Sequence, residues 1–214
     1  MLMGKSAVIT WLGHSCFRIN FNGYHVVIDP YKANSVPGLK LAKQSANAVY
    51  CSHEHSDHSD REAVLLISEK HPIPYQISTV QTAHDAVGGA ERGMNLIHIF
   101  DYDGLRIAHF GDIGSPLTAD QLKKLGRVDI AMIPIGGHFT IDAKQACELA
   151  DLLKPIVFIP MHYRSDHFGY GAIGTLDDFL AICPNAVHYN SNTITVSREM
   201  PKQTAILQYE EPQN

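Results

Sequence analysis

The chain has 214 residues, 45% of them hydrophobic and 18% charged, a composition typical of a globular protein that can bury a core without disulfide bonds. The net charge of −5 and the scattered distribution of the 17 basic residues argue against a nucleic-acid partner. No run of 18 apolar residues occurs, so no membrane-spanning segment is predicted. Histidine is unusually frequent, with 13 residues, and since imidazole is the commonest side-chain metal ligand, metal binding becomes the first hypothesis.

The first fifty residues are predicted to form strands joined by one tight hairpin. Asn22-Gly23 supplies the two residues with positive φ that a type I′ turn requires. The predicted strands cover residues 7–11, 16–21, 25–28 and 46–51, with a long loop over 31–45.

The second half of the chain predicts helices that alternate with buried strands. Four helix starts resemble a capping box, at Ser59/Glu62, Thr118/Gln121, Asp142/Gln145 and Thr175/Asp178. Further strands are expected over 94–102, 105–110, 128–134, 156–161 and 205–208, the first two joined by an Asp103-Gly104 turn. This order favours an α/β fold, an αββα sandwich of two mixed β-sheets with helices on the outer faces, in a single domain over residues 1–214.

The four cysteines predict reduced thiols. Cys16, Cys51, Cys147 and Cys183 form no C-x-x-C pair and are too few for a disulfide scaffold. The first residues also lack the apolar stretch and cleavage site of a secretory signal. Both observations indicate a cytoplasmic protein.

The most informative segment is His53-Glu54-His55-Ser56-Asp57-His58, which directly follows a predicted strand. Side chains at the carboxyl end of a strand face the crevice where α/β proteins bind ligands. In a tight loop, the four potential ligands can divide into two pairs, with His53 and His55 facing one ion and Asp57 and His58 facing another.

This H-x-H-x-D-H pattern resembles the signature of the metallo-β-lactamase superfamily, and later residues match its other elements in order. These are Asp29, which organises loops, and then His84, Asp112 and His162. Trp11-Leu12-Gly13-His14-Ser15 and the segment 134–140 are similar to compact metal-dependent hydrolases, the ascorbate-6-phosphate lactonase-like group that includes the family UPF0173. The opening motif is also similar to the phospholipase D that acts on N-acyl phosphatidylethanolamines.

The resemblance implies two divalent metal ions per chain, zinc as the expected ion and manganese as its competitor. It assigns His53, His55 and His84 to one ion, and Asp57, His58 and His162 to the other, with Asp112 and a hydroxide bridging them. The hydroxide would attack a small ester, lactone or phosphoester, and Asp57 would also help to orient this nucleophile. His71 and His98 are alternatives to His84, although His98 and His109 are more simply interpreted as structural histidines of a sheet.

Other polar residues have two interpretations each. His138, after Gly136-Gly137, is predicted to donate a hydrogen bond to substrate or to protonate the leaving group. The alternative is a structural role at the helix that begins near Asp142. His14 contacts substrate or braces its loop. Asp29 is expected behind a ligating histidine, where it fixes the orientation of the ring. Arg164 pairs with an anionic group of the substrate or is solvated.

Four other function classes compete with the hydrolase. A nuclease of the superfamily would need a basic appendage, and a flavin-coupled di-iron enzyme usually has Glu at the position of His55. A thiol dioxygenase with one iron, or a non-catalytic metal-binding protein of the same fold, remains an alternative. The expected partner is a small-molecule substrate, with neither nucleic acid nor membrane, and the chain is a candidate for homo-oligomer formation.

Overall fold

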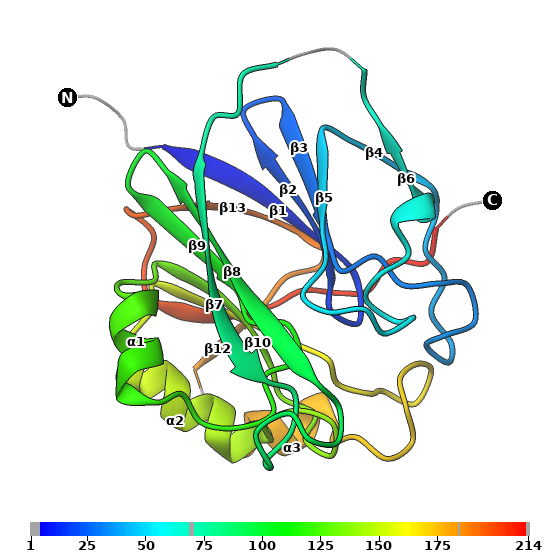
Figure 1. Ribbon diagram of the computed structural model, residues 1–214, viewed down its shortest axis with the longest axis vertical. Helices are drawn as coiled ribbons and strands as arrows, with labels where there is room; N and C mark the ends of the chain where they lie inside the picture. The colour runs from blue at the N-terminus through cyan, green and yellow to red at the C-terminus, as the bar shows by residue number, and fades with distance from the viewer. Residues whose placement is uncertain (1–4, 69–70, 184, 213–214) are drawn as a thin grey trace.

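Two β-sheets pack against each other and enclose the main apolar core in this computed structural model, which describes residues 5–68, 71–183 and 185–212 (Figure 1). The first sheet has the strand order β13-β1-β2-β3-β5, formed by β13 (Thr193–Ser197), β1 (Ser6–Gly13), β2 (Cys16–Phe21), β3 (Tyr24–Ile28) and β5 (Ala48–Tyr50). The second has the order β12-β14-β11-β10-β9-β8-β7, formed by β12 (Ala186–His188), β14 (Gln203–Ile206), β11 (Val157–Met161), β10 (Ile130–Pro134), β9 (Leu105–His109), β8 (Met94–Tyr102) and β7 (Gln76–Ala83).

Both sheets are mixed, as predicted. In the first, β3 and β5 run parallel and the other neighbours antiparallel; in the second, β7, β8 and β9 are antiparallel and the remaining strands parallel. The α/β sandwich is thus confirmed. The two hairpin turns are confirmed as well, since Asn22 and Asp103 each have a φ of 52° and are followed by glycines with positive φ.

Three short helices lie beside the larger sheet, where α1 packs against β7 and α2 against β10 (Figure 1). They are α1 (Ala119–Leu125), α2 (Ala143–Leu153) and α3 (Leu176–Leu180). Each begins with a capping box that the sequence predicts, at Thr118, Asp142 and Thr175. Local side-chain chemistry therefore sets where these helices begin.

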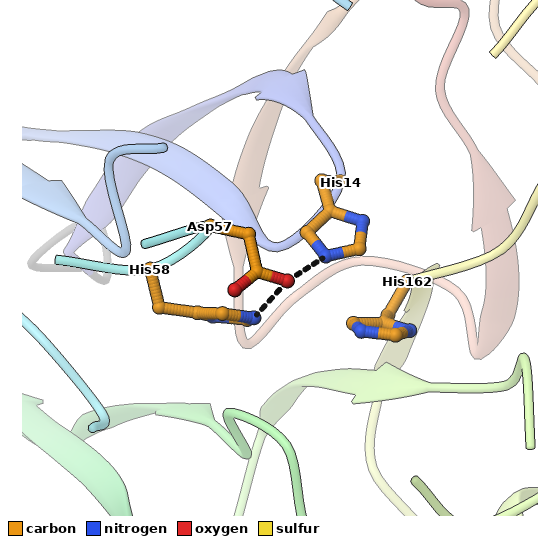
Figure 2. Close-up of side chains that lie close together, drawn as sticks. All are labelled: His14, Asp57, His58 and His162. Atoms are coloured by element: carbon orange, nitrogen blue, oxygen red, sulfur yellow. Dashed lines mark ion pairs between the residues drawn. The ribbon is translucent and has the colours of Figure 1, made fainter. Parts of the chain in front are cut away.

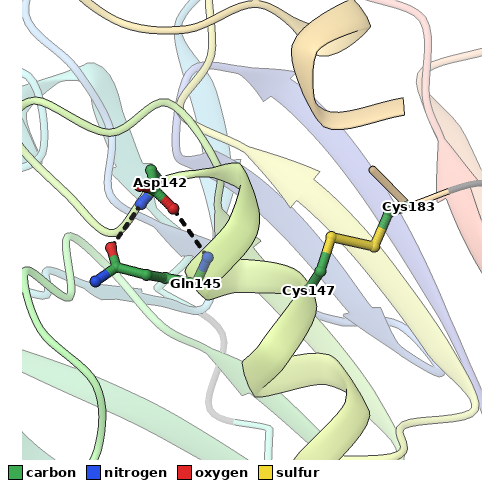
Figure 3. The surroundings of a disulfide bond; sticks show 4 residues. All are labelled: Asp142, Gln145, Cys147 and Cys183. Atoms are coloured by element: carbon green, nitrogen blue, oxygen red, sulfur yellow. Dashed lines mark hydrogen bonds between the residues drawn. A yellow bond between two sulfur atoms is a disulfide. The ribbon is translucent and has the colours of Figure 1, made fainter. Parts of the chain in front are cut away.

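Replacing Asp142 by Ala is expected to lower the free energy of unfolding by about 1 kcal/mol. The Asp142 carboxylate accepts a hydrogen bond from the Gln145 amide at 2.9 Å, and this amide has no partner within the helix (Figure 3). Urea unfolding measures the change, with Asp151→Ala on the exposed side of α2 as control. Equal stability of the two variants would contradict a capping role.

The helix predicted from Ser59 and Glu62 does not form. A 3-10 turn at Arg61–Ala63 leads instead into strand β6 (Val64–Leu66), which pairs in parallel with β4 (Gln44–Ala46). The Ser59 hydroxyl, expected to cap a helix, donates a hydrogen bond to the His55 carbonyl at 2.9 Å. The hydroxyl on which the helix prediction depended therefore stabilises the loop over residues 53–58 instead.

The strand predicted over 46–51 is divided in two. Asn47 separates β4 from β5, and it exchanges two hydrogen bonds of 2.8 Å with the backbone of His25. As a result, β5 extends the first sheet while β4 and β6 form a separate ribbon. A second apolar cluster, which includes Val27, Tyr31 and Val64, packs this ribbon and the preceding loop against the first sheet.

The prediction of four reduced thiols is wrong for one pair, because Cys147 of α2 is bonded to Cys183 after α3 (Figure 3). Packing of α2 against α3 brings the two Cα atoms to 6.3 Å, a proximity that a separation of 36 residues conceals in the sequence. Cys16 and Cys51 are free thiols. Among the described residues, no helix is long and apolar enough to cross a membrane.

Candidate metal centre

The candidate site is built on loops at the carboxyl ends of strands from both sheets. The loops after β1, β5, β7, β9 and β11 carry, respectively, His14, the segment 53–58, His84, Asp112 and His162. His14 and His162 have φ values of 52° and 53°, a left-handed conformation that is uncommon for residues other than glycine and is often found at functional sites. The strand ends thus bring together residues that lie up to 148 positions apart in the sequence, from 14 to 162.

The first group of potential ligands consists of His53, His55 and His84, whose ligand nitrogens lie within 4.8 Å of one another. The Nδ1 atom of His53 lies 2.9 Å from the Ser52 hydroxyl, while its buried Nε2 has no hydrogen-bond partner among the described residues. Burial lowers the pKa of His53 to about 3, which keeps the imidazole neutral. A neutral imidazole with one free nitrogen is the form that binds a metal ion.

The second group consists of Asp57, His58 and His162 together with His14 (Figure 2). Oδ2 of Asp57 lies 3.4 Å from Nε2 of His14 and 3.6 Å from Nε2 of His58. The His14 and His162 rings have centroids 4.1 Å apart. The sequence predicts either substrate contact or loop bracing for His14, whereas the structure places it among these potential ligands.

Asp112 lies between the two groups. Its Oδ2 atom is 3.1 Å from Nε2 of His58, 3.2 Å from Nε2 of His162 and 3.5 Å from Nε2 of His84. Burial raises the pKa of Asp112, but the surrounding imidazoles outweigh it and hold this pKa well below its ordinary value. One buried carboxylate therefore faces histidines of both groups.

Two residues behind the site hold its side chains in place. The buried carboxylate of Asp29 accepts hydrogen bonds from the Ser52 backbone amide at 2.6 Å and from the Ser52 hydroxyl at 2.6 Å, and its Oδ2 lies 2.8 Å from Nδ1 of His58. This is the organising role predicted for Asp29. Asn95 accepts a hydrogen bond from the Asp112 amide at 2.9 Å and donates one to the Phe110 carbonyl at 2.9 Å.

The sequence offers no signal for the role of Asn95, which lies near the start of strand β8. Gly111 explains how Asn95 comes so close, because a Cβ atom at this position would overlap the Asn95 side chain and the Ser52 side chain. Glycine at 111 thus permits the loops that carry His53 and Asp112 to pack together.

The site opens into a cleft of about 250 Å³. Five of its lining residues are candidate ligands: His55, Asp57, His84, Asp112 and His162. Arg92, Phe139 and Tyr170 complete the lining, and the sequence analysis identified none of them. Tyr170 donates a hydrogen bond to the Ser35 carbonyl at 2.7 Å and lies 3.1 Å from Oδ2 of Asp57.

His138, predicted as a pocket residue, is exposed and is not among the residues that line the cleft. Its ring lies 4.4 Å from that of Phe139, and it is Phe139 that faces the cleft. The turn at Gly137 causes this difference: Gly137 and His138 both have positive φ, and the Phe139 amide bonds back to the Gly137 carbonyl.

Three further residues lie outside the ligand groups. Arg164 donates a hydrogen bond to the Ile173 carbonyl at 2.7 Å and lines a different cleft. His109 lies 2.8 Å from the Ser15 carbonyl, and His98 is packed beside Tyr50. Both histidines therefore have the structural positions that the sequence analysis favoured for them.

The donor set suits a metal such as zinc, which binds imidazole nitrogen and carboxylate oxygen. Within the described residues, several buried ligand atoms have no hydrogen-bond partner, although buried polar atoms are ordinarily paired. They include Nε2 of His53, Nε2 of His58, Oδ1 of Asp112 and the ring nitrogens of His14. A bound metal ion would supply the missing partner of the carboxylate oxygen and of one nitrogen of each ring.

The sequence profile of a family described as "Beta-lactamase superfamily domain" matches residues 8–162 of the chain. With this match, fold and site define a protein of the metallo-β-lactamase superfamily. A UPF0173 metal-dependent hydrolase of Hyperthermus butylicus is 30% identical over 191 residues, covering 73% of this chain and 83% of that protein. A second, from Thermoplasma acidophilum, is 27% identical over 188 residues with coverage of 73% and 83%. The chain belongs to the UPF0173 family of metal-dependent hydrolases.

Solved structures agree with this assignment. A protein assigned as a Zn-dependent hydrolase of the superfamily from Thermotoga maritima has 25% sequence identity and a TM-score of 0.74, covering 95% of this chain and all of that chain (100%). A metallo hydrolase of Ignicoccus hospitalis, 22% identical, shares the fold with a TM-score of 0.64 over 90% of this chain and 99% of its own. The predicted superfamily, subgroup and enzyme class are thus confirmed.

Proposed function

We propose that this chain is a dinuclear hydrolase of small esters, lactones or phosphoesters. The observation that carries this proposal is the position of Asp112, whose single carboxylate faces two separate groups of ligand atoms. His53, His55 and His84 would hold one ion, Asp57, His58 and His162 would hold the other, and Asp112 would contact both. Zinc suits this imidazole-rich set, and manganese is the alternative ion.

Two bound divalent ions would acidify a water molecule into a nucleophile at neutral pH and polarise an oxygen of the substrate. The residues of the chain position these participants. Asp57 lines the cleft with its Oδ2 3.1 Å from the Tyr170 hydroxyl, so this carboxylate would help to orient an attacking water while it also contacts the second ion. Phe139 contributes an apolar ring to the lining of the cleft.

The geometry also supports His14 as a fourth ligand of the second ion. This imidazole is fully buried, and burial together with the neighbouring His162 lowers its pKa to about 4, so that it is neutral. Its backbone is fixed, because its carbonyl accepts hydrogen bonds from the Trp11 indole at 2.9 Å and from the His162 amide at 3.3 Å. With His14, the second ion would have a nearly complete protein shell, while the first would keep an open position for substrate.

Replacement of His14 by Gln is expected to weaken binding of one of the two ions by about 10- to 100-fold and to leave the other unchanged. Zinc titration against a chromogenic chelator measures both affinities. His98→Gln is the matched control, since His98 is also buried with an unpartnered ring nitrogen but lies outside the ligand groups. If both ions bind His14→Gln as they bind the control, His14 is not a ligand.

Elemental analysis combined with a substrate panel tests the proposed function. The purified chain is expected to contain two zinc or manganese ions, and to hydrolyse at least one member of a panel of lactones, thioesters, phosphodiesters and β-lactams. A chelator should abolish this hydrolysis, and the metal should restore it. Hydrolysis that survives complete removal of the metals would refute the mechanism, and one iron per chain would support the thiol dioxygenase alternative.

A further inference from the structure

We propose that Arg92 forms an anion-binding subsite in the metal cleft, so that the preferred substrate is an ester or lactone that also carries a carboxylate or phosphate group. The inference rests on the proposed hydrolase function and identifies the class of its substrate.

Arg92 is the one Lys or Arg among the described residues that line the cleft. The same side chain also borders a neighbouring groove that contains His53 and His55, and this places it on the side of the first ligand group. Because the cleft measures about 250 Å³, a small molecule that reaches the candidate metal ligands remains close to Arg92. The anionic part of such a substrate would therefore meet a positive charge.

The Arg92 guanidinium is held in place while its hydrogen-bond donors remain available. Its Cζ atom lies 5.2 Å from the centroid of the Phe139 ring, a cation–π contact that favours this position of the group. Among the described residues, Glu91 is its acidic neighbour. Nη1 of Arg92 lies 3.6 Å from Oε2 of Glu91, which is beyond hydrogen-bond distance. Arg61, by contrast, already forms two hydrogen bonds of 2.9 and 2.6 Å to the carboxylate of Glu54.

The backbone that carries Arg92 is anchored directly beside the metal centre. The carboxylate of Asp85, next to His84, accepts hydrogen bonds from four backbone amides of the loop, at distances between 2.7 and 2.9 Å. One of these amides belongs to Arg92 itself, at 2.8 Å. A binding group on a loop tied in this way is already ordered before the ligand arrives, so less entropy is lost on binding.

The planar fork of the guanidinium matches the two oxygens of a carboxylate or phosphate group. Sequence analysis considered Arg164 for this role, but Arg164 lines another cleft and its Nε donates to the Ile173 carbonyl. The two arginines thus provide a matched pair of variants, one inside the metal cleft and one outside it.

The test compares two chromogenic substrates with the same acyl chain, the anionic 4-nitrophenyl monoester of succinate and its neutral methyl ester. Arg92→Gln is expected to lower kcat/KM for the anionic ester by about 10- to 100-fold and to leave the neutral ester unchanged. Arg92→Lys should recover part of the loss, because it restores the charge but not the fork. Arg164→Gln should behave as the wild type on both esters.

A second measurement does not depend on turnover: calorimetric titration of the zinc-loaded protein with succinate. Succinate binding that weakens by about 10-fold or more in Arg92→Gln, but not in Arg164→Gln, supports the subsite. This holds even if neither ester is hydrolysed. In that case only the hydrolase proposal fails. Equal succinate affinity in wild type and Arg92→Gln, or an equal loss of kcat/KM on both esters, overturns the subsite.

Discussion

Replacing Asp112 by Asn is expected to lower hydrolysis by about a thousandfold or more and to reduce the bound zinc from two ions per chain to at most one. Oδ2 of Asp112 lies within 3.1–3.5 Å of a nitrogen of each of His58, His84 and His162. The amide keeps the shape of the side chain but removes the negative charge that both ligand groups share. Elemental analysis after desalting and kcat/KM measure the two effects.

Asp129→Asn is the matched control for this experiment. Asp129 is equally buried and forms ion pairs with Arg127 at 3.3 Å and Arg198 at 3.7 Å, away from the candidate ligands. Its loss is expected to affect stability but not zinc content. An Asp112→Asn protein with two tightly bound zinc ions and undiminished turnover would mean that Asp112 does not join the two groups.

Asp29→Asn is expected to weaken zinc binding by about 10- to 100-fold although Asp29 itself is not a proposed ligand. The carboxylate accepts hydrogen bonds from the Ser52 amide and hydroxyl, and its Oδ2 lies 2.8 Å from Nδ1 of His58. An asparagine presents an NH₂ group to one of these donors, which leaves a buried polar group unpaired at a cost of about 1–3 kcal/mol. The His58 ring then loses the contact that directs its Nε2 toward Asp112.

Two measurements separate orientation of the ligand from general loss of stability. Competition with a chelator gives the zinc affinity, and urea unfolding of the metal-free protein gives the free energy of unfolding, each compared with Asp129→Asn. We expect both Asp variants to be destabilised but Asp29→Asn alone to bind zinc more weakly. Unchanged zinc affinity in Asp29→Asn would show that the histidines orient themselves without it.

The centre of the site could be predicted from the sequence because its ligands lie in short motifs at strand ends. The segment 53–58 carries four potential ligands within one loop, and Asp112 and His162 each directly follow a predicted strand. Asp112 and His162 follow strands that run in the same direction in one sheet, which places them at the same edge. The loop 53–58 comes from the other sheet, and its meeting with them was implied by the resemblance to the superfamily.

The walls of the cleft could not be predicted in this way. Arg92, Phe139 and Tyr170 come from three loops without a shared motif, and only the folded chain brings them together. Local geometry decided between neighbours as well: the turn at Gly137 directs Phe139 rather than His138 into the cleft. His14 illustrates the same limit, because its motif attracted attention but only tertiary packing places its ring 4.1 Å from that of His162.

The helix predicted at Ser59 and the reduced thiols predicted at Cys147 and Cys183 failed because contacts formed in the folded chain decided the outcome. Ser59 has the spacing to Glu62 that begins a helix, yet its hydroxyl bonds to the His55 carbonyl and the chain continues into a strand. Cys147 and Cys183 give no signal in the sequence, and the packing of two helices joins them. Thr118, Asp142 and Thr175 show the opposite case, in which local capping chemistry persists in the folded protein.

The most direct test of a dinuclear centre is an anomalous difference map from a crystal of the zinc-loaded protein, recorded at the zinc absorption edge. We expect two peaks about 3.5–4 Å apart. One should lie against His53, His55 and His84, and the other against Asp57, His58 and His162, with Asp112 reaching both. A single peak bound by residues of one group alone, at full zinc occupancy, would contradict the dinuclear centre.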